Sequence, residues 1–174
     1  MTIALQLEVQ DLNARYVQAI DDNRLEAWPD FFTEHGRYRV TTAENVERSL
    51  PLGLIHATSR AMLRDRVRSL RDANVYEAQR YRHLIGAPLI EPPPPAKRVE
   101  DARERADAGE GKGGGVQAQS SFMVARIMHT GETMLFATGR YQDHIVFADG
   151  EACFAEKVVI LDSRLIDTLL AIPL

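Results

Sequence analysis

The stretch that decides the fold is residues 137–174, which read ATGRYQDHIVFADGEACFAEKVVILDSRLIDTLLAIPL. Two long runs rich in β-branched and aromatic residues meet there at Asp149-Gly150, a dipeptide typical of a tight hairpin turn. A third run precedes them and ends at Gly131-Glu132. We therefore expect an antiparallel meander of strands at 116–129, 133–147 and 151–162.

Two amphipathic helices are expected in the first half of the chain. In residues 3–22, apolar side chains recur at steps of three and four and form one stripe. These side chains are Leu5, Val9, Leu12, Tyr16 and Ile20. A later helix begins at Thr58 or Ser59, either of which can cap it, and its apolar face is Leu63, Val67 and Leu70. Its arginines form either a solvated face or a docking surface.

The remaining elements are shorter. Asp21-Asp22-Asn23 can cap a short helix that contains Leu25, Trp28, Phe31 and Phe32, with Pro29 in its first turn. Strands are expected at 37–42 and 80–90, and a short edge strand is possible at 54–57. Long strands curve, so helices would fill the concave face. The predicted class is α+β, a single domain over 1–174 with helices on the concave face of a curved antiparallel sheet.

Residues 92–115 break the pattern. They run PPPPAKRVEDARERADAGEGKGGG from Pro92, with almost no apolar side chain to bury. Such a composition is typical of a flexible or disordered excursion. We expect it to be an insertion in the domain rather than part of the core.

Composition excludes several classes of function. The formal charge of −4 disfavours nucleic acid as a partner, because phosphate binding needs a basic surface. No segment approaches the length of a membrane span and no leader is visible at the N-terminus, so a cytoplasmic protein is expected. The one cysteine, Cys153, lies in an apolar strand pattern and is expected to be a small buried side chain.

Catalytic machinery is hard to find in the sequence. None of the five histidines forms a local metal motif with Asp or Glu, and a Rieske cluster needs two cysteines where the chain has one. Inward polar side chains could act as acid or base, and His83 with a carboxylate would be the natural pair. The candidates are Tyr16, Asp21, Tyr38, Tyr81, His83 and Asp162. The alternative is that all of them are structural polar groups with satisfied hydrogen bonds.

An ordered set of segments resembles one family. The segments are AWPDFFT at 27–33, YRVT at 38–41, SRAMLRDRVRSLRDANVYE at 59–77, RYRH at 80–83, GRYQD at 139–143 and LDSRLIDTLLAIPL at 161–174. Together they look like the β (small) subunit of aromatic-ring-hydroxylating dioxygenases. Within that family, RSLRDANVYE, RIMHTGE at 126–132 and the DTLLAIPL end are similar to the small subunits of terephthalate dioxygenases.

The resemblance implies an NTF2-like (cystatin-like) cone in an α3β3 Rieske non-haem iron oxygenase. The large subunit would hold the [2Fe-2S] cluster and the mononuclear iron, bind an aromatic acid and receive NAD(P)H-derived electrons from a reductase for cis-dihydroxylation with O2. This chain would be the non-catalytic structural subunit, with no catalytic, cofactor or metal residue of its own. The 92–115 insertion is a departure from the family pattern.

Two other functions remain open on the residues alone. One is a stand-alone isomerase or dehydratase that uses His83 and an inward carboxylate, and the other is a small-molecule binding module that uses the cone interior. For an assembly subunit, we expect Trp28, Arg80 and Arg82 at the interface, because aromatic and arginine side chains often anchor association. The alternative is that Trp28 belongs to the core and the arginines pair internally.

Overall fold

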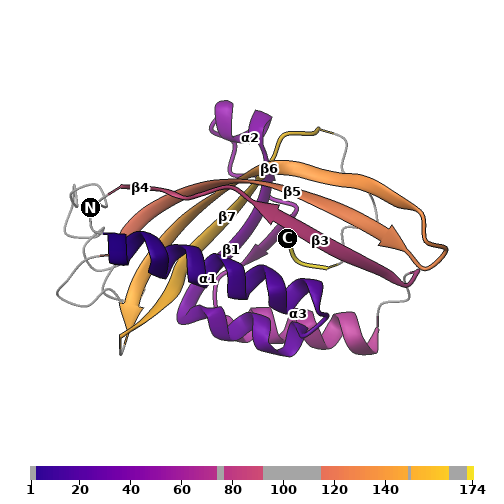
Figure 1. Cartoon of the computed structure of the whole chain (residues 1–174), viewed down its shortest axis with the longest axis horizontal. Coiled ribbons are helices and arrows are strands. Elements are labelled where there is room, and N and C mark those ends of the chain that lie inside the picture. Colours follow the sequence, from indigo (N-terminus) through magenta and orange to yellow (C-terminus); the bar gives the residue numbers. More distant parts are fainter. Residues whose placement is uncertain (1–2, 74–76, 92–114, 149, 165–171) are drawn as a thin grey trace.

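The computed structural model describes residues 3–73, 77–91, 115–148, 150–164 and 172–174. Its strands form one curved sheet of seven strands in the order β2-β1-β7-β6-β5-β3, with β4 also paired to β5. Figure 1 shows the sheet arching over the helices α1 and α3. We call the side of the sheet toward these helices the concave face and the opposite side the convex face.

The helices of the concave side form as the apolar periodicity predicts. α1 spans Ile3–Asp21 and buries the stripe from Val9 to Ile20. α3 spans Arg60–Asp72, and its N-cap Ser59 accepts a hydrogen bond from the backbone N–H of Met62 at 3.3 Å. Leu63, Val67 and Leu70 are its buried residues. Each helix therefore buries one face against the sheet and leaves the other in solvent.

The meander predicted for the last third is confirmed. β5 spans Val116–Met128, β6 spans Thr133–Ala148 and β7 spans Glu151–Leu161, and β6 is antiparallel to both β5 and β7. Gly131 and Gly150 have φ angles of +89° and +83°, which a residue with a side chain rarely adopts. The two turns thus depend on glycine at these positions.

The expected single strand over 80–90 is wrong. Two strands take its place, β3 at Gln79–Ile85 and β4 at Leu89–Glu91, both antiparallel to β5. Pro88, which has no backbone N–H, lies in the gap. The backbone N–H of Gly86 still donates to the carbonyl oxygen of Ser121 at 2.8 Å, so the chain stays on β5 through the interruption.

The first strand differs most from expectation. β1 spans Phe32–Thr42 rather than 37–42, so Phe32 leaves the short helix η1, which ends at Phe31 after starting at Leu25. β1 pairs in parallel with β7, and the sheet is therefore mixed rather than antiparallel. Its other neighbour is the short strand β2 at Ile55–Ala57. A parallel pair needs a long connection, and here residues 43–150 supply it.

A further short helix lies on the convex side. α2 spans Ala43–Glu47 directly after β1, with the Thr42 hydroxyl capping the backbone N–H of Asn45 at 3.3 Å. Figure 1 shows it above the sheet, opposite α1 and α3. The expected excursion at 92–115 lies outside the described residues apart from Gly115.

Candidate functional site

The concave face of the sheet and the helices enclose a cluster of aromatic side chains. The fully buried aromatic residues are Tyr16, Trp28, Phe32, Tyr38, Tyr141 and Phe154. The Trp28 and Tyr38 ring centroids are 5.1 Å apart in an edge-to-face contact. The expectation that Trp28 is an exposed interface anchor is therefore wrong, because η1 turns its indole onto the core.

A buried ion pair lies inside this cluster. Nζ of Lys157 is 3.0 Å from Oδ1 and 2.9 Å from Oδ2 of Asp143, and neither side chain has any exposed surface. The ammonium is also 3.9 Å from the centre of the Tyr141 ring and 4.3 Å from that of Phe154. Burial raises the pKa of Asp143 and lowers the pKa of Lys157, and their mutual attraction opposes both shifts. No local pattern in the sequence indicated this pair.

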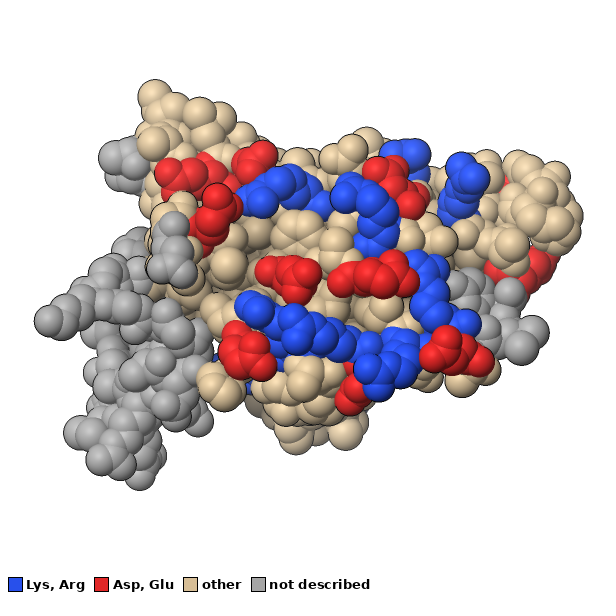
Figure 2. All heavy atoms as spheres, turned by 90° about the horizontal axis from the view of Figure 1, so that it is seen from below, with Lys and Arg blue, Asp and Glu red and all other residues tan. Residues whose placement is uncertain are grey.

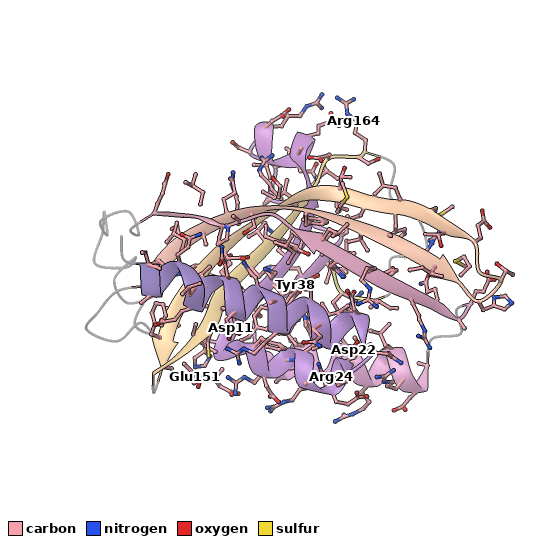
Figure 3. The ribbon with its side chains drawn as sticks, in the orientation of Figure 1. Asp11, Asp22, Arg24, Tyr38, Glu151 and Arg164 are labelled. Atoms are coloured by element: carbon pink, nitrogen blue, oxygen red, sulfur yellow. The ribbon has the colours of Figure 1, made fainter. Side chains whose placement is uncertain are left out.

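The residue Leu174 fills the same interior. Its carbonyl oxygen accepts a hydrogen bond from the Tyr16 hydroxyl at 2.8 Å and from the Tyr38 hydroxyl at 3.2 Å. Burial raises the pKa of Tyr38 to about 12 and the pKa of Tyr16 well above its ordinary value. Figure 3 shows Tyr38 between the sheet and the helices. Both tyrosines thus satisfy a buried carbonyl and stay protonated at neutral pH.

The carboxylate expected beside His83 is Asp21. Nδ1 of His83 lies 2.6 Å from Oδ1 of Asp21, and the backbone N–H of His83 donates to Oδ2 at 2.9 Å. The side chain of His83 has no exposed surface and that of Asp21 has 3%. The pair joins the end of α1 to the edge strand β3 by two hydrogen bonds to one carboxylate. This geometry fastens a helix to a sheet and offers no open face of the imidazole to a substrate.

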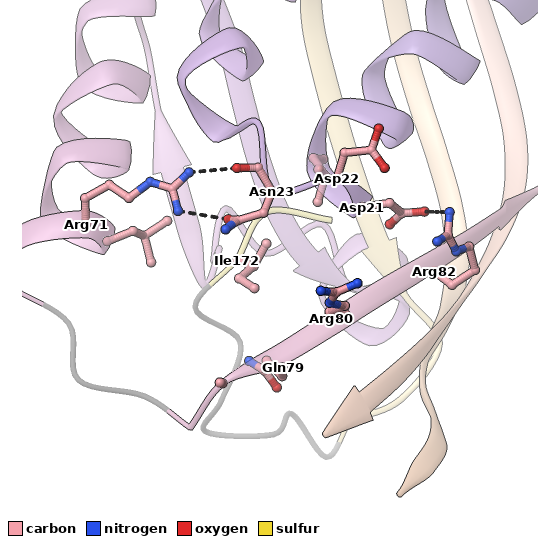
Figure 4. Close-up of a pocket in the computed structure, with 11 residues that line it drawn as sticks. Asp21, Asp22, Asn23, Arg71, Gln79, Arg80, Arg82 and Ile172 are labelled. Carbon is pink, nitrogen blue, oxygen red and sulfur yellow. Dashed lines mark hydrogen bonds and ion pairs between the residues drawn. The ribbon is translucent and has the colours of Figure 1, made fainter. Parts of the chain in front are cut away.

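A pocket of about 690 Å³ opens where α1 and α3 end beside β3. Figure 4 shows its polar wall, where Arg71 is hydrogen-bonded to Asn23 and Arg82 lies near Asp21. Nη1 of Arg82 is 3.8 Å from Oδ2 of Asp21. Both Arg80 and Arg82 are exposed, so the structure leaves these two interface candidates at the surface.

The outer face of the helices is covered with ion pairs. Figure 2 shows acidic and basic side chains interspersed over this face. Arg64 pairs with Asp30 at 3.3 Å, and Nε of Arg71 is 2.7 Å from Oε1 of Glu26. Nε of Arg60 donates to the carbonyl oxygen of Phe32 at 2.8 Å. The arginines of α3 therefore tie it to η1 and β1.

Of the other sequence candidates, Tyr81 lies beside the Asp21–His83 pair, with its ring centroid 6.2 Å from that of His83 in an edge-to-face contact. Tyr81 is buried and also stacks on Phe136 with centroids 5.1 Å apart. Asp162 is exposed, and its backbone N–H donates to the carbonyl oxygen of Thr138 at 3.0 Å. Cys153 is half-buried rather than buried, and partial burial raises the pKa of its thiol. The structure therefore gives no reason to regard Cys153 as an activated nucleophile.

Within the described residues, no group of three or more His, Cys, Asp or Glu side chains could hold a metal ion. None of the helices in that same part of the chain combines the length and apolar character that a membrane crossing requires.

Comparison with known proteins matches both the fold and the sequence. The model of the SnoaL-like domain family matches residues 1–158. The terminal oxygenase subunit beta 1 of terephthalate 1,2-dioxygenase from Comamonas sp is 39% identical over 169 residues, which cover 97% of this chain and 98% of the relative. The anthranilate 1,2-dioxygenase small subunit of Burkholderia cepacia is 35% identical over 167 residues, which cover 96% and 92%.

A solved structure gives the same result. A chain from Novosphingobium aromaticivorans, assigned as the β subunit of an aromatic-ring-hydroxylating dioxygenase, matches with a TM-score of 0.79 at 33% identity. The match covers 98% of this chain and 97% of the other. The NTF2-like α+β fold expected from the sequence is thereby confirmed, with the mixed sheet as its correction. The chain belongs to the SnoaL-like domain family and, within it, to the small (β) subunits of aromatic-ring-hydroxylating dioxygenases.

Proposed function

We propose that this chain is the non-catalytic structural subunit of a terminal oxygenase, in which a large subunit carries out the chemistry. The observation that carries the proposal is similarity to dioxygenase β subunits along nearly the full length of both chains. The filled interior supports it, because Lys157, Asp143 and Leu174 occupy the space where a cone could hold a ligand. An oxidoreductase complex, rather than this chain alone, is the enzyme.

The donor set of this chain does not fit the cofactors of such a complex. A Rieske [2Fe-2S] cluster takes two cysteines and two histidines, and the half-buried Cys153 is the sole cysteine. We therefore assign the cluster and the mononuclear Fe(II) to the large subunit. Electrons would reach them from NAD(P)H through a separate reductase component.

The class of substrate is inferred from the names of the relatives. Their names specify terephthalate and anthranilate, both of which are aromatic carboxylic acids. We propose an aromatic acid of the terephthalate type as the substrate of the complex and O2-dependent cis-dihydroxylation as the reaction. For the assembly we propose α3β3.

The Asp21–His83 pair does not favour a stand-alone isomerase or dehydratase. An acid–base imidazole must come within hydrogen-bond reach of a substrate proton, and the His83 ring is enclosed. The pocket beside Asp21 is lined mainly by charged and polar side chains, whereas sites for small molecules are mostly apolar. The assembly function therefore remains the better supported one.

Co-expression with a large subunit encoded in the same gene neighbourhood tests the proposal. We expect native mass spectrometry to find a complex with equal numbers of both chains. Iron and terephthalate oxidation should require the large subunit. A chain that stays monomeric beside a folded large subunit, or that contains stoichiometric iron by itself, would contradict the proposal.

A further inference from the structure

Three large apolar side chains lie together on the convex face, where β3, β5 and β6 run side by side. Leu84 pairs with Met123 across β3 and β5, and Leu135 on β6 pairs with Ala125 of β5. The residue exposures are 61% for Leu84, 42% for Met123 and 64% for Leu135. Contiguous exposed apolar side chains on a sheet mark an interaction surface more often than isolated ones.

The alternation of the strands explains why these side chains face outward. Directly adjacent residues such as His83 and Val124 point to the concave face and are buried there. A one-residue register shift would exchange the two sets, so the fold cannot bury Leu84 and Met123 while it keeps its core. In the described part of the chain, α1 and α3 cover only the other face of the sheet.

Arginines lie around the apolar side chains, and two of them, Arg80 and Arg82, lie on the edge strand β3, where they also line the pocket beside Asp21. In the ladder, Arg82 lies opposite Ala125 and Arg80 opposite Ile127, while Arg140 lies opposite Ser121. Arg80 and Arg140 form no ion pair or side-chain hydrogen bond within the described residues, and the Arg82 contact with Asp21 is long at 3.8 Å. The arginines of α3 named above contrast with them, because each has a partner in the fold.

This local charge opposes that of the whole chain. The chain has a formal charge of −4, yet the ladder rows of β3, β5 and β6 that contain Leu84, Met123 and Leu135 include Arg82 and no acidic residue. An apolar centre with arginine and methionine and few acidic groups is the usual composition of a protein interface. The charge pattern selects a partner that supplies carboxylates around an apolar centre.

We propose that this convex patch, formed by Leu84, Met123, Leu135 and Arg140 with Arg80 and Arg82 at its β3 edge, is the docking surface for the large subunit. The assignment rests on the proposed function, since it names the surface through which that assembly forms. A second copy of this chain is a poorer occupant. In a two-fold symmetric contact the patch would meet itself and place arginines against arginines.

Paired variants test the surface in the assembled complex. Leu135→Asp and Arg80→Glu change the patch. The control for Leu135→Asp is Leu7→Asp on α1, where Leu7 is 58% exposed. The control for Arg80→Glu is Arg68→Glu on α3. We expect each patch variant to weaken binding to the large subunit by about tenfold or more, since anchors of this kind dominate interface energy. Both controls should bind within about twofold of wild type, because isolated surface changes have small effects.

The outcomes separate this inference from the proposed function. If the wild-type chain does not bind the large subunit, the proposed function itself fails. If wild type binds and both patch variants bind equally well, the convex patch is the wrong surface. A homodimer of the isolated chain that Arg80→Glu dissociates would also overturn the assignment, in favour of a second copy. Urea unfolding of each variant checks that lost binding does not reflect lost folding.

Discussion

The two faces of the same sheet have opposite properties, although alternate residues of the same strands build them. On the concave face, even the charged residues Lys157 and Asp143 are buried and satisfied within the fold. On the convex face, Leu84 and Leu135 are exposed, and Arg80 has no partner in the described residues. Burial therefore does not follow the polarity of these side chains. The concave face makes its interactions within the chain, whereas the convex face leaves side chains available for interactions outside it.

The largest expected effect comes from adjacent residues of β5. Phe122 is buried and stacks on Tyr141 with centroids 4.3 Å apart, whereas Met123 faces out. Phe122→Ala should lower the free energy of unfolding by about 3–5 kcal/mol, as aromatic truncations in cores do. Met123→Ala should change it by no more than about 0.5 kcal/mol. Urea denaturation measures both, and equal losses would mean that the isolated chain already covers its convex face.

The buried ion pair gives the next largest effect. Asp143→Asn keeps the shape but leaves the Lys157 ammonium without a counter-charge, so we expect a loss of about 1.5–3 kcal/mol. The double variant Asp143→Leu/Lys157→Met should recover much of this loss, because an apolar pair of similar volume avoids the desolvation of two charges. Thermal and urea unfolding compare the two variants. A double variant less stable than the single one would show that the pair is a net stabilising element.

The smallest effect belongs to the ion pairs of the helix layer. The hydrogen bond from Arg71 lowers the pKa of Glu26, a residue whose side chain is 65% exposed. Stability from this pair is present above the ordinary pKa of 4.5 and is lost as the pH falls through the lower folded-state value. Glu26→Gln should cost only a few tenths of a kcal/mol at neutral pH, because solvent screens the pair.

A pH titration of stability checks this last expectation. The difference between wild type and Glu26→Gln should shrink as the pH falls below 4.5. A difference that grows toward acid pH would contradict the sign of the pKa shift.

Local patterns predicted most of the helices and the last three strands. The α1 stripe needs only the spacing of Val9, Leu12 and Tyr16, and the meander needs only alternation and the glycine turns. A pair between His83 and a carboxylate was predicted from the sequence, and Asp21 was one of the candidate residues. The parallel neighbour of β1 was not foreseen, because no local feature of 32–42 specifies a partner at the other end of the chain.

The buried ion pair shows why the site was harder to predict than the fold. A regular hairpin continued from the Ala148–Glu151 pair would place Asp143 opposite Glu156, two like charges. A register shift between His144 and Ile145 instead aligns Asp143 with Lys157. The alternation of side chains along a strand could have predicted that Asp143 faces inward, as Tyr141 does. The position of the β-bulge depends on tertiary packing and cannot be predicted from the local sequence.

The parallel contact between β1 and β7 also bears on how the protein is made. β1 emerges from the ribosome early in synthesis. Val40 on β1 gains its main neighbour in the sheet only after β7, which contains Val159, has been made. The short β2 is its only other described strand partner. Contacts so distant in sequence slow folding and leave strand edges open meanwhile. A nascent chain that stops before β7 should therefore engage chaperones, and the sheet should close only after synthesis nears its end.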